Sequence, residues 1–153
     1  MTAPSTNPAG CNCLALRQAA RHVTQFYDQF LAPSGLRTTQ YSILARLQRK
    51  GPMTINALAG ELVMDRTTLG RNILPLQRDG LIAVGPGHSD RRSKELRLTA
   101  AGAARFRLAL KAWQEAQAQF ETGFGSRRAK ELRALLHEVA TNEPARDKAG
   151  SHA

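Results

Sequence analysis

Five polar side chains that could bind nucleic acid follow one another along the stretch DRTTLGRNILPLQRDG, residues 65–80. Their guanidinium, hydroxyl and amide groups suit phosphates and base edges better than a protein core, and they are Arg66, Thr67, Thr68, Arg71 and Asn72. Leu69, Ile73 and Leu76 recur among them at helical spacing. We therefore expect a helix that buries its leucine and isoleucine side and exposes the polar residues. The simpler alternative for the two threonines is that they only complete the first helical turn.

The ends of this helix are marked by residues with specific backbone roles. Asp65 can act as its N-cap, with Met64 and Leu69 forming a hydrophobic staple around it. Gly80 can adopt the left-handed conformation that ends a helix. Pro75 lies inside the helix and removes one backbone hydrogen bond, so we expect a kink there rather than a break.

A basic loop with the sequence GPGHSDRRSKE follows at residues 85–95. The apolar residues of 81–84 and 94–98 predict two antiparallel strands around it, with Leu96 and Leu98 on one face. Before Glu95, this segment contains one acid and four basic or titratable side chains: Asp90, His88, Arg91, Arg92 and Lys94. A basic hairpin of this kind, called a wing, would project toward a DNA duplex. The simpler alternative is that Asp90 and Arg92 form no more than a solvated turn pair.

The charge of the chain favours a polyanionic partner. Its 153 residues include 22 Lys and Arg against 12 Asp and Glu, which gives a net charge of +10. Residues 37–97 hold 11 of the basic residues and 5 of the acidic ones, so most of the excess lies in the segment with the polar helix and the wing. Nucleic acid is the partner that this distribution indicates.

The apolar patterns before the polar helix predict three further helices. Residues 13–31 carry a broad apolar stripe, which the turn residues at 33–35 would end. Thr38 or Thr39 would cap a second helix. Thr54 would cap a short third helix, whose spacing from the helix at Asp65 is that of a helix-turn-helix.

The C-terminal part is expected to form one long and one short helix. The long helix would run from Thr99 to about Thr122, where Gly123 and Gly125 would interrupt it. Ser126 would cap the last helix. The first helix and these two lie outside the helix-turn-helix, yet they carry wide apolar stripes with aromatic residues, and apolar surface of that size needs a partner.

A second copy of the chain would cover these stripes. It would also place two recognition helices one turn of B-DNA apart, so a pseudo-palindromic operator is the expected target. The predicted fold is mainly α with a small β-hairpin wing: a winged helix-turn-helix in an obligate-type homodimer through its N- and C-terminal helices.

The predicted organisation along the chain has five segments. Residues 1–12 are expected to form a mobile tail and residues 143–153 a disordered one, because small, polar or charged residues dominate both. Residues 13–36 and 99–142 are expected to be the dimerisation helices. Residues 37–98 are expected to be the winged helix-turn-helix lobe that binds DNA.

The order of these elements is similar to that of the MarR family of bacterial winged-helix repressors, over roughly residues 13–140. The segment SDRRSKELRLTAAG, residues 89–102, looks like the wing signature of that family: an acid, an arginine two residues later, a strand ending in Leu-Thr, and a helix. The resemblance implies that Arg92 enters the minor groove, that Asp90 orients it and that Arg91 contacts phosphate. It also implies that the polar helix described above is the recognition helix.

Cys11 and Cys13 form a second candidate site, because thiols near a helix start in a basic chain can react with oxidants. Residues 13–27, CLALRQAARHVTQFY, resemble the first helix of the family's organic-peroxide-sensing branch, whose reactive cysteine is held by tyrosines of the partner subunit. Cys13 and Tyr27 fall on two of those positions, and Thr38 replaces the second tyrosine. Cys13 would then sense oxidants, and Cys11 would either resolve an intersubunit disulfide or take no part. The alternative is that Cys13 is a small buried hydrophobic residue at the helix start.

The resemblance further implies a cleft that binds a small aromatic acid as inducer, between the dimerisation helices and the DNA-binding lobe. Four aromatic residues and one basic residue would line it: Phe26, Tyr27, Phe30, Arg46 and Trp113. An aromatic stripe of this kind can equally belong to the core.

The sequence as a whole predicts a sequence-specific DNA-binding transcriptional regulator, a repressor relieved by a small aromatic ligand or by thiol oxidation. The alternative is a small thiol-based redox enzyme or peroxide scavenger that uses Cys11 and Cys13. No enzyme motif is evident, and the Cys-x-Cys pair has no histidine at zinc-site spacing, so no enzyme activity, cofactor or metal is expected. Without a membrane-length apolar segment or a signal peptide, a cytoplasmic protein with no membrane partner is expected.

Overall fold

The computed structural model describes residues 7–142. The expected disordered tail at 143–153 and the first half of the expected mobile tail lie outside the described residues. The described chain divides into two compact units, residues 7–117 and residues 118–142. The elements of the first unit are a 3-10 turn η1 (Pro8–Gly10), α1 (Asn12–Leu31), a second 3-10 turn η2 (Ala32–Ser34), α2 (Thr38–Lys50), β1 (Met53–Thr54), α3 (Ile55–Leu62), α4 (Arg66–Arg78), β2 (Ile82–Pro86), β3 (Lys94–Leu98) and most of α5 (Ala100–Phe124). The second unit contains the end of α5 and α6 (Ser126–Thr141).

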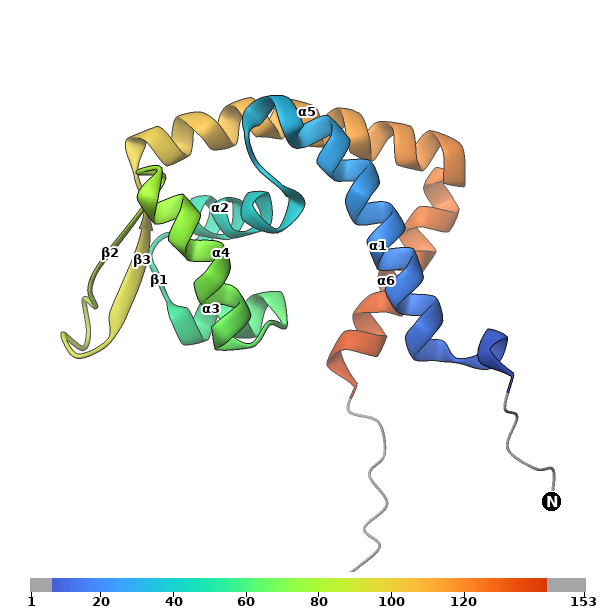
Figure 1. Cartoon of the computed structure of the whole chain (residues 1–153), viewed down its shortest axis with the longest axis horizontal. Coiled ribbons are helices and arrows are strands. Elements are labelled where there is room, and N and C mark those ends of the chain that lie inside the picture. Colours follow the sequence, from blue (N-terminus) through green and yellow to red (C-terminus); the bar gives the residue numbers. More distant parts are fainter. Residues whose placement is uncertain (1–6, 143–153) are drawn as a thin grey trace, which may run out of the picture. The chain divides into compact units, whose positions relative to one another are not determined.

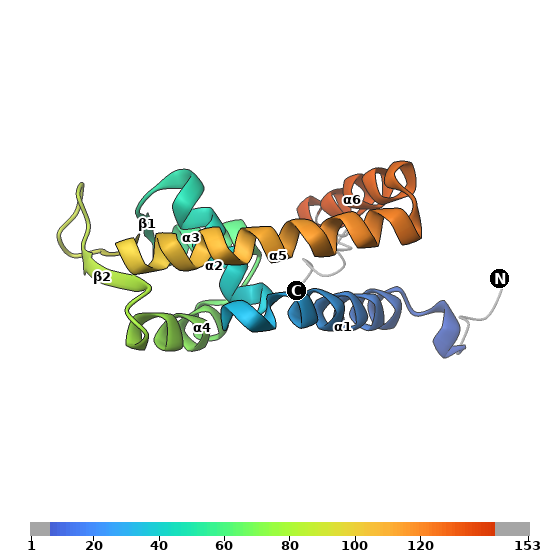
Figure 2. The same cartoon turned by 90° about the horizontal axis from the view of Figure 1, so that it is seen from above.

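The strands form a three-stranded antiparallel sheet in the order β1-β3-β2, and the loop between β2 and β3 is the predicted wing (Figure 1). Seen from above, this hairpin projects past the start of α5 (Figure 2). The register places Ile82 opposite Leu98 and Pro86 opposite Lys94. β1 was not predicted, because two residues are too few to show an alternating pattern; Met53 lies opposite Leu96.

The core of the first unit contains the apolar residues that the helical spacing predicted. Tyr41, Leu44 and Leu47 of α2 and Leu69, Ile73 and Leu76 of α4 are all at most 6% exposed. They belong to the same core cluster as Leu96 of β3, which is fully buried. Gly102 allows α5 to pass close to the sheet, since a Cβ atom there would meet the Leu81 carbonyl oxygen at 2.1 Å. The apolar face of α4 is thus fixed, and so is the direction of its opposite face.

The start of α2 differs from the prediction of a threonine cap. Arg37 occupies the N-cap position, and α2 begins at Thr38. The Thr38 backbone N–H and hydroxyl both donate to Asp28 Oδ1, each at 2.7 Å. An acid from the preceding helix therefore satisfies a free N–H at this helix start, and spacing within α2 gave no sign of it.

The second unit also departs from the prediction at its glycines. α5 continues through Gly123 and ends at Phe124, and Gly125, with φ of 102°, separates it from α6. One glycine inside a helix costs only about 1 kcal/mol, which neighbouring contacts can offset. The predicted cap at Ser126 is wrong, since α6 begins at Ser126 and its N-cap, Gly125, makes no side-chain cap bond. The guanidinium of Arg128 lies 4.3 Å from the centre of the Phe124 ring across this turn.

Candidate nucleic-acid interface

Helix α4, the predicted recognition helix, begins at the predicted cap. Asp65 Oδ1 accepts the backbone N–H of Thr68, and Asp65 Oδ2 accepts the Thr68 hydroxyl, both at 2.8 Å. These hydrogen bonds from Thr68 stabilise the charged carboxylate and hold the pKa of Asp65 below its usual value. The helix runs through Pro75 without a break, as predicted.

The five predicted contact residues of α4 fall into two groups. Arg66, Thr67 and Arg71 are exposed on the helix surface. Thr68 and Asn72 are engaged within the helix, because the Thr68 hydroxyl caps it as described and Asn72 Nδ2 donates to the Thr68 carbonyl at 2.9 Å. The first three side chains are therefore free to extend toward a ligand, whereas the other two would have to exchange a bond in order to do so.

Leu74 and Arg78 share the exposed face of α4 with Thr67 and Arg71, and the sequence prediction left both out. At 100° per residue, these four positions point away from the side that carries Leu69 and its buried neighbours. Leu74 is 65% exposed, and the Arg78 guanidinium lies 3.8 Å from Asp79. The 4, 3, 4 spacing of positions 67, 71, 74 and 78 could have identified them.

The wing loop is closed by hydrogen bonds between its own residues. Gly87 N–H donates to the Ser93 carbonyl at 2.8 Å, and the Ser93 hydroxyl donates to the Asp90 carbonyl at 2.8 Å. Asp90 Oδ1 accepts the backbone N–H of Arg92 at 2.9 Å. Asp90 thus fixes the backbone at Arg92, while the side chains of Arg91 and Arg92 are exposed.

A glycine is required at the base of the wing loop. A Cβ atom at Gly87 would lie 2.6 Å from the Asp90 carbonyl oxygen and would also overlap the Ser93 hydroxyl. The loop is therefore a tight, defined turn with its two arginines on the outside. The wing and α4 both join the same sheet, because α4 leads into β2 through Gly80, with φ of 72°, and the wing connects β2 to β3.

The five residues predicted to line a ligand cleft make contacts in three places. The Phe26 ring lies against Tyr27 and Phe30 with ring centres 5.7 and 5.2 Å apart. Trp113 instead stacks on Tyr41 at 5.9 Å. Arg46 points to Glu61 of α3, with its Nε 3.5 Å from the carboxylate.

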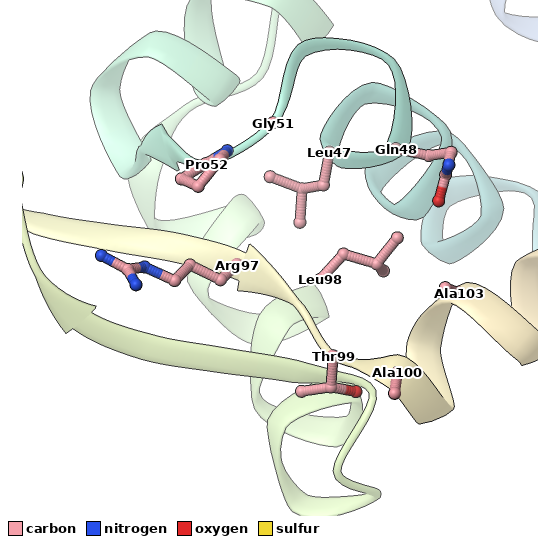
Figure 3. Close-up of a pocket in the computed structure, with 9 residues that line it drawn as sticks. All are labelled: Leu47, Gln48, Gly51, Pro52, Arg97, Leu98, Thr99, Ala100 and Ala103. Carbon is pink, nitrogen blue, oxygen red and sulfur yellow. The ribbon is translucent and has the colours of Figure 1, made fainter.

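One depression in the first unit lies elsewhere, between the end of α2 and the start of α5 (Figure 3). None of the predicted cleft residues lines it; its walls are Leu47, Gln48, Gly51, Pro52, Arg97, Leu98, Thr99, Ala100 and Ala103. It is open to solvent, and its lining has one charged side chain, Arg97. The predicted cleft thus stays a prediction.

Both cysteines are exposed and reduced in the chain as described. Cys11 is the N-cap residue of α1, and its Sγ accepts the Leu14 N–H at 3.4 Å. The two hydroxyls that the resemblance associates with Cys13 are bonded elsewhere: the Tyr27 hydroxyl donates to Gln117 Oε1 at 2.5 Å, and the Thr38 hydroxyl donates to Asp28. Within residues 7–142, His, Cys, Asp and Glu side chains form no group of three that could hold a metal, and no helix is both long and apolar enough to cross a membrane.

Comparison with known proteins identifies the family. The model of the MarR family matches residues 36–94, which include the helix-turn-helix and most of the wing. MosR, a transcriptional regulator of M. tuberculosis, is 36% identical over 86% of this chain and 96% of MosR, with a TM-score of 0.74. The structure of MosR in complex with DNA gives 37% identity over 86% of this chain and 99% of that one, with a TM-score of 0.72. A search of curated proteins found no match.

A more distant structure extends the likeness of the fold. BpsR of Bordetella bronchiseptica, whose DNA binding is regulated by 6-hydroxynicotinic acid, has a TM-score of 0.81 at 19% identity, over 92% of this chain and 100% of BpsR. The winged helix-turn-helix predicted from the sequence is confirmed by these structures. The chain belongs to the MarR family of transcriptional regulators.

Proposed function

We propose that the protein is a homodimeric repressor that binds a pseudo-palindromic operator, with α4 in the major groove and the wing in the minor groove. The observation that carries this proposal is the exposed surface of α4, which presents Thr67 and Arg71 away from the core and exposes Arg66 in its first turn. Guanidinium and hydroxyl groups on a helix of this kind can bind both phosphates and base edges. The DNA complex of MosR, a relative of 37% identity, supports the same partner.

The wing provides the second contact. Arg92 is exposed at the tip of a closed loop, and its backbone is held by Asp90. A narrow minor groove attracts arginine by its negative potential, so this side chain would read the shape of the duplex. Residues 37–98 would then form the DNA-binding lobe, and residues 13–36 and 99–142 would hold the dimer.

The signal that releases the operator is proposed to be a small aromatic acid or an oxidant. Either one must favour a dimer geometry in which the distance between the two recognition helices no longer matches one turn of B-DNA. For the oxidant, a thiolate of Cys13 would attack an organic hydroperoxide, giving a sulfenic acid and the alcohol. Condensation of that sulfenic acid with the Cys11 thiol would release water and form a disulfide. The exposure of both thiols supports this route.

The test is selection of genomic fragments by the purified protein, followed by titration of the best fragment over a range of salt concentrations. We expect affinity in the range of about 10 to 0.1 nM and a steep fall with salt. Arg92→Ala should weaken operator binding by about 1–3 kcal/mol, whereas Arg107→Ala, an exposed arginine on α5, should have little effect.

Two results would contradict the proposal. One is equal affinity for all fragments, and the other is operator affinity that Arg92→Ala leaves unchanged. Consumption of peroxide in the presence of a thiol reductant, without a defined DNA site, would support the redox enzyme instead.

A further inference from the structure

Glu95 is buried although it lies on the face of β3 opposite the core. Leu96, its neighbour on the strand, points into the core and is 0% exposed, so the alternation of a strand directs Glu95 to the other side. Glu95 is nevertheless only 9% exposed. Burial of a carboxylate is costly unless the group is hydrogen-bonded or paired. Its surroundings should therefore explain why an acid occupies this position.

The carboxylate of Glu95 holds the start of the wing loop. Its Oε1 accepts the backbone N–H of His88 at 3.2 Å. Its Oε2 lies 3.9 Å from Arg97 Nη2, which is too long for a hydrogen bond, and is otherwise buried without a hydrogen-bond partner. Within residues 7–142, the bond to His88 is thus the one hydrogen bond that the Glu95 side chain makes.

This contact adds a third anchor to the wing loop. The Gly87 N–H bond to Ser93 closes the base of the loop, and the Asp90 side chain fixes the backbone at Arg92. The first of these bonds continues the β2–β3 pairing by one residue, and the second joins two residues of the loop. The bond from Glu95 to His88 ties the loop to the central strand, and β3 also pairs with β1 at Thr54, the N-cap of α3.

We propose that Glu95 is a positioning residue that sets the angle of the wing and thereby places Arg92 in the minor groove while α4 occupies the major groove. The inference rests on the proposed function. The proposed role does not depend on an interaction between the carboxylate and DNA, because the repulsion between a carboxylate and phosphates is unfavourable. Glu95 acts through the oxygen that accepts the His88 N–H.

Whether removal of Glu95 weakens or strengthens operator binding distinguishes a positioning role from simple electrostatic repulsion. Removal of an acid from a DNA-binding protein should strengthen binding to any duplex, because the repulsion between that acid and the phosphates is lost. A positioning role predicts the opposite for the operator. Specific binding should weaken, while binding to non-specific DNA stays the same or becomes slightly stronger.

The experiment compares Glu95→Ala, Glu95→Gln and the charge-matched control Glu115→Ala, an exposed acid on α5. Operator and non-specific dissociation constants are measured together with melting temperature. We expect Glu95→Ala to weaken operator binding about five- to thirty-fold, which lies in the lower part of the range for a backbone N–H that loses its acceptor. Glu95→Gln keeps an accepting oxygen and should stay within about threefold of the wild type. The control should not weaken operator binding.

A double variant tests whether Glu95 acts through Arg92. If it does, Arg92→Ala should cost much less operator affinity in the Glu95→Ala background than in the wild type, because a displaced Arg92 would already contribute little to operator binding. Additive losses would overturn the inference, as would an unchanged Glu95→Ala or an equal loss in Glu95→Gln. Should Glu95→Ala fail to fold, hydrogen exchange of the His88 amide in the wild-type dimer decides: protection supports the bond, and fast exchange contradicts it.

The outcomes separate this inference from the proposed function. A wild-type protein with no preferred fragment, or an Arg92→Ala variant with full affinity, would refute the DNA-binding assignment itself. Loss of affinity in Arg92→Ala with none in Glu95→Ala would leave that assignment standing and refute only the role of Glu95.

Discussion

Leu74 is an exposed leucine on the surface that we propose to face DNA. With 65% of its surface exposed, it gains little from packing within the chain. The thymine methyl group is the apolar feature of the major groove that a side chain can contact. We expect Leu74→Ala to lower operator affinity by about 1 kcal/mol, the value of roughly one buried methyl or methylene group. Leu108→Ala, an exposed leucine on α5, is the control. Because residues 99–142 are proposed to hold the dimer, sedimentation verifies that this variant is still dimeric, and as a dimer it should bind the operator as the wild type does.

Operators with uracil in place of single thymines identify the base involved. At the contacted position, loss of the methyl should weaken wild-type binding by a similar amount and leave Leu74→Ala binding unchanged. Competition titrations with each substituted operator measure this. If no uracil position distinguishes the two proteins, Leu74 does not read a thymine.

Cys13 is the residue on which the oxidation route depends. We expect an organic hydroperoxide to release wild-type protein from its operator and to leave Cys13→Ser bound, because serine cannot form a sulfenic acid. Electrophoretic mobility shifts with and without a thiol reductant measure the release. Equal release of both proteins would assign the response to another group, and absence of release from both would favour the aromatic acid as signal.

At the scale of elements, Tyr41 joins α2 to α5. Its ring stacks on Phe106 with centres 5.5 Å apart and on Trp113 at 5.9 Å. Burial disfavours the phenolate and raises the pKa of Tyr41 to about 12, above its usual value of 10.0. The folded protein therefore keeps this proton more strongly than the unfolded chain between those two pH values.

This difference predicts a loss of stability in alkali. The contribution of neutral, buried Tyr41 is complete below pH 10 and is lost as the pH rises toward 12. The melting temperature of the wild type should consequently fall more steeply over this range than that of Tyr41→Phe, which has no proton to lose. Parallel curves for the two proteins would show that Tyr41 does not titrate in this way.

The sequence predicted the elements whose signal is local. The Asp65 cap, the buried triad of Leu69, Ile73 and Leu76, and the β2–β3 hairpin all follow from periodicity and from the residues at the ends of elements, and the structure confirms them. Asp28 accepts hydrogen bonds from Thr38, ten residues away at the start of α2, and the buried Glu95 accepts one from His88, seven residues away. Such tertiary contacts leave no periodic pattern, so those features required the structure.

The sequence contains more of the exposed face of α4 than the prediction included. Leu74 and Arg78 follow from the same helical spacing that predicted Arg71, but an exposed leucine is easily taken for core and an arginine near a helix end for a solvated charge. The hydrogen bonds that Thr68 and Asn72 make at the start of α4 and within it are visible in the structure alone, and their contact with DNA stays a prediction. Sequence alone does not show which polar side chains of a helix form hydrogen bonds within that helix.

At the scale of the whole molecule, apolar surface at both ends of the chain supports a dimer. Leu14 and Leu16 of α1 are 38% and 40% exposed, and Leu135 and Val139 of α6 are 60% and 57% exposed. Leucines and valines at this density on amphipathic helices are typical of protein interfaces. We propose that a second copy covers both helices and so determines the distance between two α4 helices.

Hydroxyl-radical footprinting of the selected operator, with sedimentation of the same sample, tests the central proposal most directly. Two copies of α4 and of the wing should give two protected segments one turn of B-DNA apart, about 10 base pairs, flanked by minor-groove protection that disappears in Arg92→Ala. The protein should sediment as a dimer at micromolar concentration. A single protected segment bound by a monomer, or flanking protection that persists in Arg92→Ala, would contradict the account.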